Sequence, residues 1–225
     1  MSAPQPIAIE VDADQRVSGI ALSPPKARAA VVLGHGAGAG MAHPFMAALA
    51  GGLAERGIAT LRYQFAYMER GSKRPDAPKL AHAVVRAAVA AAAVRWPGLR
   101  LAAGGKSFGG RMTSQAEALA HLPGVAGIVF FGFPLHPADK PGIERAEHLD
   151  RVALPMLFLQ GTRDELAERA LLQGVVERLQ PRATLRLFDG ADHSFHVRAR
   201  SGRNDAAVMS ELLDGATAWI TATMD

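Results

Sequence analysis

The sequence has no cysteine among its 225 residues. That absence excludes disulfide bonds, thiolate zinc sites and a cysteine nucleophile, and it fits a reducing compartment. The first fifteen residues, MSAPQPIAIEVDADQ, show no basic leader followed by an apolar core, so we expect a cytoplasmic protein without a signal peptide. The longest apolar run, Val125 to Leu135, contains glycines and a proline and is too short to cross a bilayer, so no membrane partner is expected.

The chain also has little excess of one charge. Lysine and arginine number 25 against 21 aspartates and glutamates, which gives a formal net charge of +4. Most of the basic excess is arginine scattered as single residues rather than runs. Such a pattern is typical of a solvated mixed-charge surface, and we expect no nucleic-acid partner.

Short apolar runs alternate with helical patterns along the chain. The opening segments 7–11 and 17–22 predict a hairpin, and further strands are predicted at 29–35, 58–65, 99–105, 126–133, 155–161 and 183–190. Helices are predicted at 44–56, 76–96, 108–121, 165–179 and 205–222. Several strands are apolar throughout, which is typical of strands covered on both faces. The prediction is an α/β protein, with a single doubly wound, mostly parallel sheet and helices on both faces, in one domain spanning residues 1–225.

The segment LAAGGKSFGG, residues 101–110, allows two interpretations. Gly105-Lys106-Ser107 could end a phosphate-binding loop, but that loop needs a first glycine where this sequence has Arg100. The same residues form G-x-S-x-G between a predicted strand and a predicted helix. This is the sharp turn that presents a nucleophilic serine, and it predicts Ser107 as the nucleophile.

A second glycine-rich stretch, GHGAGAG at 34–40, follows a predicted strand and satisfies G-x-G-x-x-A. A dinucleotide site would need an acidic ribose partner about 20 residues on, where the chain has Arg62 and no carboxylate. Arg62 could serve an NADP-dependent reductase, which remains an alternative. Beside a serine nucleophile, the same glycines instead let backbone amides approach a carbonyl oxygen as part of an oxyanion hole.

A serine hydroxyl needs a histidine to take its proton and a carboxylate to orient that histidine. Asp164 directly follows the predicted strand at 155–161, and His193 follows the strand at 183–190. Carboxyl ends of parallel strands share one edge of a sheet, so both side chains are expected near Ser107. Glu165 is the nearest alternative to Asp164 as the acid, and His196 is the alternative to His193 as the base. Asp189 and Asp192 lie too close to His193 in sequence to replace an acid from the preceding loop easily. A metal site at His193 and His196 lacks a third ligand at useful spacing, so no metal is expected.

These motifs (GHGAGAG, GGKSFGGRM at 104–112, GTRD at 161–164 and DHSF at 192–195) resemble the α/β-hydrolase superfamily, in particular its small dienelactone-hydrolase-like branch. The resemblance runs from about residue 17 to the end. It implies Ser107, Asp164 and His193 as a triad, and it implies the amide of Phe108 and that of Ala37, or of a neighbour in the 35–38 loop, as oxyanion donors. Dienelactone hydrolases use a cysteine nucleophile; the serine here favours esterase chemistry. Related proteins also include subunits of complexes that are not enzymes.

Two further residues are candidates for substrate binding. Arg111, just after the serine turn, could anchor a carboxylate or form a structural salt bridge. His35 lies in the glycine-rich loop and is a candidate contact or a structural residue. The connection 134–154 is too short for a lid, and the polar connection 66–80 is predicted to be a mobile rim. We therefore predict a serine hydrolase of small esters or thioesters with a small-molecule ester as partner, no cofactor, and a monomeric or homodimeric state. The alternative is a non-catalytic binding or scaffold protein with the same fold.

Overall fold

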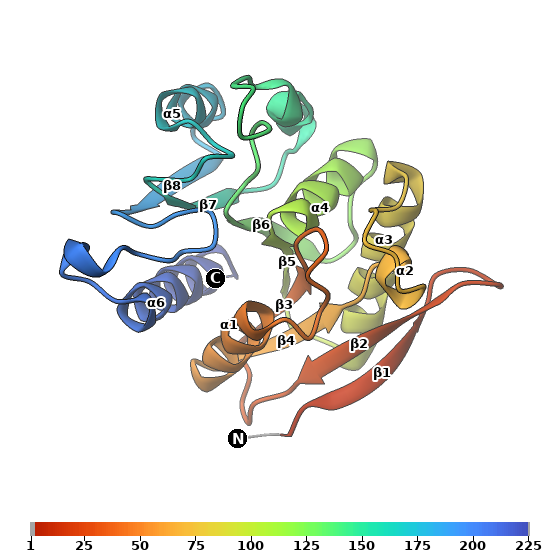
Figure 1. Cartoon of the computed structure of the whole chain (residues 1–225). Helices are drawn as coiled ribbons and strands as arrows, with labels where there is room; N and C mark the ends of the chain where they lie inside the picture. Colours follow the sequence, from red (N-terminus) through yellow and green to blue (C-terminus); the bar gives the residue numbers. More distant parts are fainter. Residues whose placement is uncertain (1–2, 225) are drawn as a thin grey trace.

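The computed structural model describes residues 3–224 and contains one eight-stranded sheet in the order β1-β2-β4-β3-β5-β6-β7-β8 (Figure 1). The pairs β1–β2 and β2–β4 are antiparallel, and every other neighbouring pair is parallel. The strands are β1 Gln5–Glu10, β2 Arg16–Leu22, β3 Ala29–Gly34, β4 Ile58–Tyr63, β5 Leu101–Lys106, β6 Val125–Phe131, β7 Met156–Gly161 and β8 Ala183–Phe188. The mostly parallel α/β sheet predicted from the sequence is confirmed.

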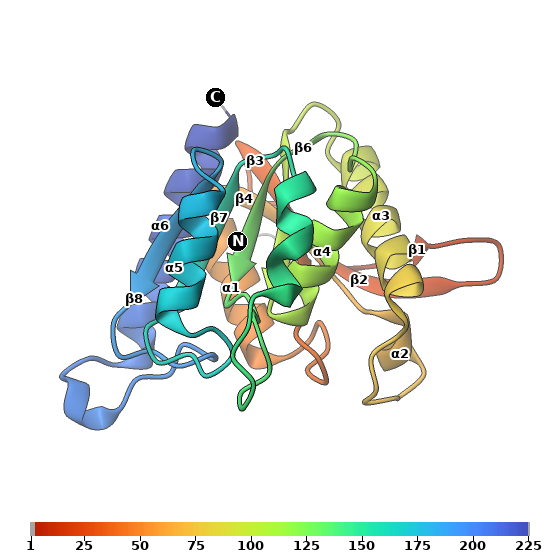
Figure 2. The same cartoon turned by 90° about the horizontal axis from the view of Figure 1, so that it is seen from above.

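The helices cover both faces of this sheet (Figures 1 and 2). Their bounds are α1 Pro44–Glu55, α2 Ala66–Glu69, α3 Pro78–Arg95, α4 Phe108–Leu119, α5 Arg169–Arg178 and α6 Asp205–Met224, with 3-10 segments η1 Glu144–Arg151 and η2 Ala199–Ser201. Helices α1 and α6 contact each other on one face, while α3 and α4 pack side by side on the other. Only η1 lies between β6 and β7, so no cap domain is inserted there.

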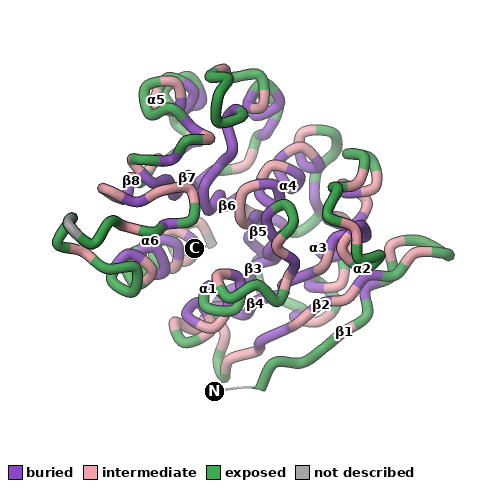
Figure 3. The backbone as a smooth tube through the Cα atoms, viewed as in Figure 1, coloured by how far each residue is buried: buried purple, intermediate pink, exposed green. Residues whose placement is uncertain are grey.

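Alternate residues of β3 show how the two faces form the core. Val31 and Leu33 pack in the apolar cluster that contains residues of α1 and α6, whereas Ala30 and Val32 pack in the cluster built on α3 and α4. All six residues of β3 are therefore buried, which explains why this strand has no polar alternation. Figure 3 shows the buried backbone concentrated in the central strands and exposed residues along the edge strand β1.

Two predicted helices begin later than expected, and part of the connection 66–80, predicted to be a mobile rim, packs against the protein. The predicted helix at 165–179 begins only at Arg169. The predicted helix at 76–96 begins at Pro78, because the Asp76 carboxylate accepts from the amide of Tyr67 and pairs with Arg70. Those contacts belong to the connection 66–80, which contains the short helix α2 and the buried Tyr67. This part of the connection packs against the protein.

Within residues 3–224, none of the helices combines the length and apolar character needed to cross a bilayer.

Candidate active site

The serine turn joins the end of β5 to the start of α4. Ser107 has φ 50° and ψ −114°, a conformation that non-glycine residues rarely adopt and that stores backbone strain. A Cβ on Gly105 would lie 2.1 Å from the carbonyl oxygen of Gly34, and one on Gly109 would lie 2.3 Å from the same oxygen. Both flanking glycines are thus required by the close approach of β3 to the turn, which is the physical reason for the G-x-S-x-G pattern.

The structure brings Ser107, His193 and Asp164 into one chain of hydrogen bonds. The Ser107 hydroxyl lies 2.9 Å from Nε2 of His193, and Nδ1 of His193 lies 2.7 Å from Oδ2 of Asp164. With the proton on Nδ1, the imidazole donates to the carboxylate and accepts from the serine, which is the tautomer a general base needs. Sequence separations of 86 and 29 residues are bridged because β5, β7 and β8 end at one edge of the sheet.

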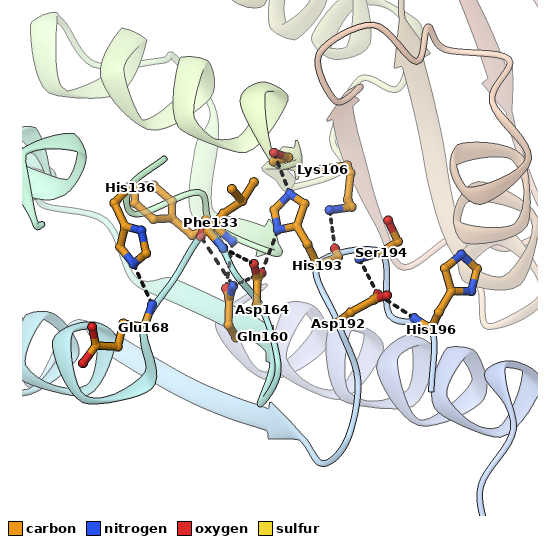
Figure 4. Close-up of polar contacts among 12 residues, drawn as sticks. Lys106, Phe133, His136, Gln160, Asp164, Glu168, Asp192, His193, Ser194 and His196 are labelled. Atoms are coloured by element: carbon orange, nitrogen blue, oxygen red, sulfur yellow. Dashed lines mark hydrogen bonds and ion pairs between the residues drawn. The ribbon is translucent and has the colours of Figure 1, made fainter. Parts of the chain in front are cut away.

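Asp164 is buried and held from three sides. The amide of Leu166 donates to its Oδ1 at 2.8 Å, and Oδ2 accepts from both His193 and the side-chain amide of Gln160 (Figure 4). A carboxylate that accepts several hydrogen bonds is held in one orientation. Gln160 was not singled out in the sequence; its one signal is a polar residue near the end of the apolar strand PMLFLQG.

The rival residues have other partners. Asp192 accepts from the amides of Ser194 and His196, which shapes the loop that carries His193 (Figure 4). His196 pairs through Nδ1 with Asp205 at 2.6 Å. Asp189 accepts from the hydroxyl of Thr162 at 3.3 Å. None of these three contacts reaches Ser107 or the base, so the geometry favours Asp164 and His193 over their neighbours.

The glycine-rich loop after β3 lies against the serine turn. A Cβ on Gly36 would be 3.9 Å from the Cβ of Ser107. The Gly38 amide donates to the Tyr67 hydroxyl at 3.1 Å, which removes it as a free donor. Within residues 3–224, the amides of Ala37 and Phe108 donate to no protein acceptor, and Ala37 lines the cavity beside Ser107. Phe108 also begins α4, where the helix dipole favours negative charge.

His35 is fully buried beneath this loop rather than facing the cavity. Its Nε2 accepts from the Phe65 amide at 3.0 Å, and its Nδ1 donates to the Gly36 carbonyl at 2.8 Å. Burial lowers the pKa of His35 to about 4, so the ring is neutral at physiological pH and can keep both bonds. His35 therefore supports the loop from beneath. Of the two roles considered from the sequence, substrate contact and structural residue, this position favours the structural one.

Two arginines considered from the sequence also lie away from the cavity lining. Arg111 is in the first turn of α4, and burial, with repulsion from Arg145 as a smaller cause, lowers its pKa. Among the described residues it forms no salt bridge, and its buried Nε has no partner. Arg62 is buried and donates to the carbonyl of Met41 at 3.0 Å, an anchoring contact inside the protein.

A cavity of about 760 Å³ opens at the serine. Ser107 and His193 lie in its wall with Lys106, a residue that sequence reasoning did not single out although it sits inside the motif. The remaining wall is mainly apolar and comes from α1, α6 and the loops after β3, β7 and β8; its larger side chains are Phe45, Met46, Leu166, Phe195 and Met209. The arrangement offers a nucleophile, a base and two free amides beside an apolar space, a combination suited to acyl transfer.

The comparisons with known proteins fit this geometry. Residues 27–221 match the model of a family described as an alpha/beta hydrolase domain. A solved alpha-beta serine hydrolase homologue from Coxiella burnetii is 18% identical with a TM-score of 0.76, and the match covers 98% of each chain. A dienelactone hydrolase from Anabaena variabilis is 22% identical with a TM-score of 0.76 over 99% of each chain. A serine hydrolase without a lid from Xanthomonas campestris is 18% identical with a TM-score of 0.75, over 98% of this chain and 96% of that one.

Proposed function

The chain belongs to the alpha/beta hydrolase family, and from this premise we propose that it is a lid-less, dienelactone-hydrolase-like serine hydrolase of small carboxylic esters or thioesters. One observation carries the proposal. Ser107, His193 and Asp164 are linked by hydrogen bonds of 2.9 and 2.7 Å, and the serine and histidine lie in the wall of the cavity.

In the first half of the proposed reaction, the acyl group is transferred to Ser107. Nε2 of His193 takes the hydroxyl proton as Oγ of Ser107 attacks the carbonyl carbon, and the negative charge moves to the carbonyl oxygen. The amides of Phe108 and Ala37 donate to that oxygen. The imidazolium, stabilised by Asp164, then gives its proton to the departing alcohol or thiol. The acyl group is left on Ser107.

Hydrolysis of the acyl-enzyme repeats these steps with water. His193 takes a proton from the water as its oxygen attacks the acyl carbon, and then returns that proton to Oγ as the ester bond to Ser107 breaks. The acid is released and the enzyme regains its starting protonation state. The residues supply both half-reactions by themselves, so the proposal includes no cofactor or metal.

The cavity supports small substrates. Without an inserted cap the serine is reached directly from outside, and apolar walls suit the hydrocarbon part of an ester. A volume of about 760 Å³ lies within the usual range for small-molecule sites.

Labelling with a fluorophosphonate tests the proposal. The wild-type chain should gain one adduct by intact mass, and Ser107→Ala should gain none. Ser194→Ala is the matched control, because Ser194 lines the same cavity without contacting His193 Nε2. Turnover of a panel of esters and thioesters should fall by about 10⁴–10⁶ in Ser107→Ala. A folded wild type that forms no adduct would favour the non-catalytic scaffold instead.

A further inference from the structure

Lys106 places a half-buried ammonium group directly beside the reacting residues. Its Nζ donates to the main-chain carbonyl of His193 at 2.6 Å, while its own peptide bond leads to Ser107 (Figure 4). The Lys106 side chain therefore links the serine turn to the main chain of His193. Lys106 and His193 come from separate elements, the end of β5 and the loop after β8.

Two aromatic rings lie beside the ammonium group. Nζ lies 6.0 Å from the ring centre of Phe45 and 5.8 Å from that of Phe195, and the two rings are stacked with centres 5.9 Å apart. A cation near ring faces gains electrostatic stabilisation that partly offsets the loss of water. The rings belong to α1 and to the histidine loop, so the lysine also joins the two sides of the cavity wall.

The backbone leaves space for this contact. Gly132 follows β6 with φ 74°, and a Cβ there would lie 3.1 Å from Nζ and 3.4 Å from Cε1 of His193. The glycine thus admits the ammonium and the imidazole together. No salt bridge to Lys106 is formed within residues 3–224, although the charges of Asp164 and Asp192 act on it.

A half-buried lysine without an ion-pair partner loses part of its hydration, and that loss costs folding free energy. Burial lowers the pKa of Lys106 to about 8, against the opposing effect of Asp164 and Asp192. A neutral side chain of similar length would fill the same space without that cost. The charged group and its bond to His193 therefore need an explanation beyond packing.

We propose that Lys106 is a positioning residue that fixes the main chain of His193 relative to Ser107 and so holds the base at hydrogen-bonding distance from the nucleophile. The proposal rests on the hydrolase function argued above. A displacement of about 1 Å between reacting groups can cost about a hundredfold in rate, so one bond at this point has a large effect. Binding of an anionic substrate by Lys106 is the competing role.

The test compares Lys106→Met with wild type and with Lys140→Met, an exposed lysine outside the cavity lining. We expect Lys106→Met to lower kcat and the rate constant of fluorophosphonate labelling by about 10- to 100-fold, with KM changed by less than about threefold. Both rates depend on activation of Ser107 by His193, whereas KM reports contact with the substrate. Lys140→Met should match wild type in all three.

A rescue experiment separates the charge from a general loss of packing. Because the chain has no cysteine, Lys106→Cys creates a single thiol. In denaturant its thiolate displaces bromide from 2-bromoethylamine, which leaves an ammonium at the length of a lysine side chain; the protein is then refolded beside mock-treated wild type. The aminoethylated protein should regain most of the labelling rate that untreated Lys106→Cys has lost. This pair also decides the question if Lys106→Met does not fold.

The outcomes are distinct. Labelling of Lys106→Met within about twofold of wild type overturns the positioning role while leaving the hydrolase function intact. A raised KM with unchanged kcat and labelling assigns Lys106 to substrate binding instead and also overturns it. If aminoethylation of Lys106→Cys does not restore the labelling rate, the ammonium group is not what positions His193, and the proposal is overturned. Wild type that never labels overturns the hydrolase function and this inference with it.

Discussion

The side-chain amide of Gln160 donates to Oδ2 of Asp164, the same oxygen that accepts from Nδ1 of His193. The Gln160 oxygen accepts from the amide of Phe133 at 2.8 Å, which fixes which end of the amide faces the carboxylate. The glutamine is buried, so neither bond competes with water. Gln160 therefore orients Asp164, the acid of the proposed triad, through a contact with the main chain after β6.

We expect Gln160→Leu to lower kcat by about 10- to 100-fold, because a hydrogen bond to a charged group contributes about 1.5–3 kcal/mol and the carboxylate would lose its fixed orientation. The measurement is kcat for a small ester, with thermal unfolding as a check on the fold. Gln115→Leu is the control, since Gln115 contacts His82 outside the cavity lining. A rate equal to wild type would show that Leu166 and His193 suffice to hold Asp164.

A second prediction concerns Gly109, whose added Cβ would lie 2.3 Å from the carbonyl of Gly34. Backbone atoms cannot move aside as a flexible side chain can, so Gly109→Ala should push α4 away from β3. We expect a loss of about 1–3 kcal/mol in unfolding free energy together with a large loss of labelling at Ser107. Urea unfolding and the labelling rate measure the two effects.

Gly51→Ala provides the comparison, because Gly51 also lies in a helix and has open space where the Cβ would go. It should gain about 0.4–1 kcal/mol and label normally. Equal stability of the two alanine variants would contradict the close approach of β3 to the serine turn.

Acid should destabilise the fold through its neutral buried histidines. Burial lowers the pKa of both His35 and His148 to about 4, from an ordinary 6.5. Between these pH values the unfolded chain binds protons that the folded chain does not bind, so stability is lost as pH falls from about 6.5 to about 4. Each site can account for about 3 kcal/mol over that interval.

The double variant His148→Leu, Ser114→Ala removes one such site with its partner, because the Ser114 hydroxyl lies 2.7 Å from Nε2 of His148. Its unfolding free energy should fall less steeply with acid than that of wild type. Parallel curves for the double variant and wild type would rule out His148 as a source of acid sensitivity.

The sequence was sufficient for the features that follow from short patterns. The central strands could be predicted because burial on both faces demands continuous apolar runs, as in β3 and β7. The serine turn could be predicted because its glycines respond to a steric requirement that leaves a fixed spacing. The order of Ser107, Asp164 and His193 could be placed because each follows a predicted strand, and the parallel sheet then brings those strand ends together.

The features that were missed depend on contacts between distant segments. Helix α2 lies in a polar connection without helical periodicity, and Tyr67 is buried there through its neighbours, including the bond from Gly38 to its hydroxyl. Gln160 and Lys106 are single polar residues whose roles arise from partners 27 and 87 positions away. No local pattern marks such contacts, so only the folded chain reveals them.

The last prediction concerns Lys106 at alkaline pH. Its pKa of about 8 in the folded protein lies below the ordinary 10.5, so between these values the unfolded chain binds more protons than the folded one. The stability of wild type should therefore rise, relative to Lys106→Met, as pH increases from about 8 to about 10.5, by about 3 kcal/mol in all. Below pH 8 the buried charge imposes its full cost.

The charged groups that act on this lysine do not remove the effect. Asp164 and Asp192 favour the ammonium and are already included in its lowered pKa. His43, His193 and His196 line the same cavity. Urea unfolding of wild type, Lys106→Met and Lys140→Met at about pH 7.5 and about pH 10 measures the difference. The difference in unfolding free energy between wild type and Lys140→Met should not change with pH. If the difference between wild type and Lys106→Met does not change either, burial does not disfavour the charged form of Lys106, and the cost that motivates its positioning role is absent.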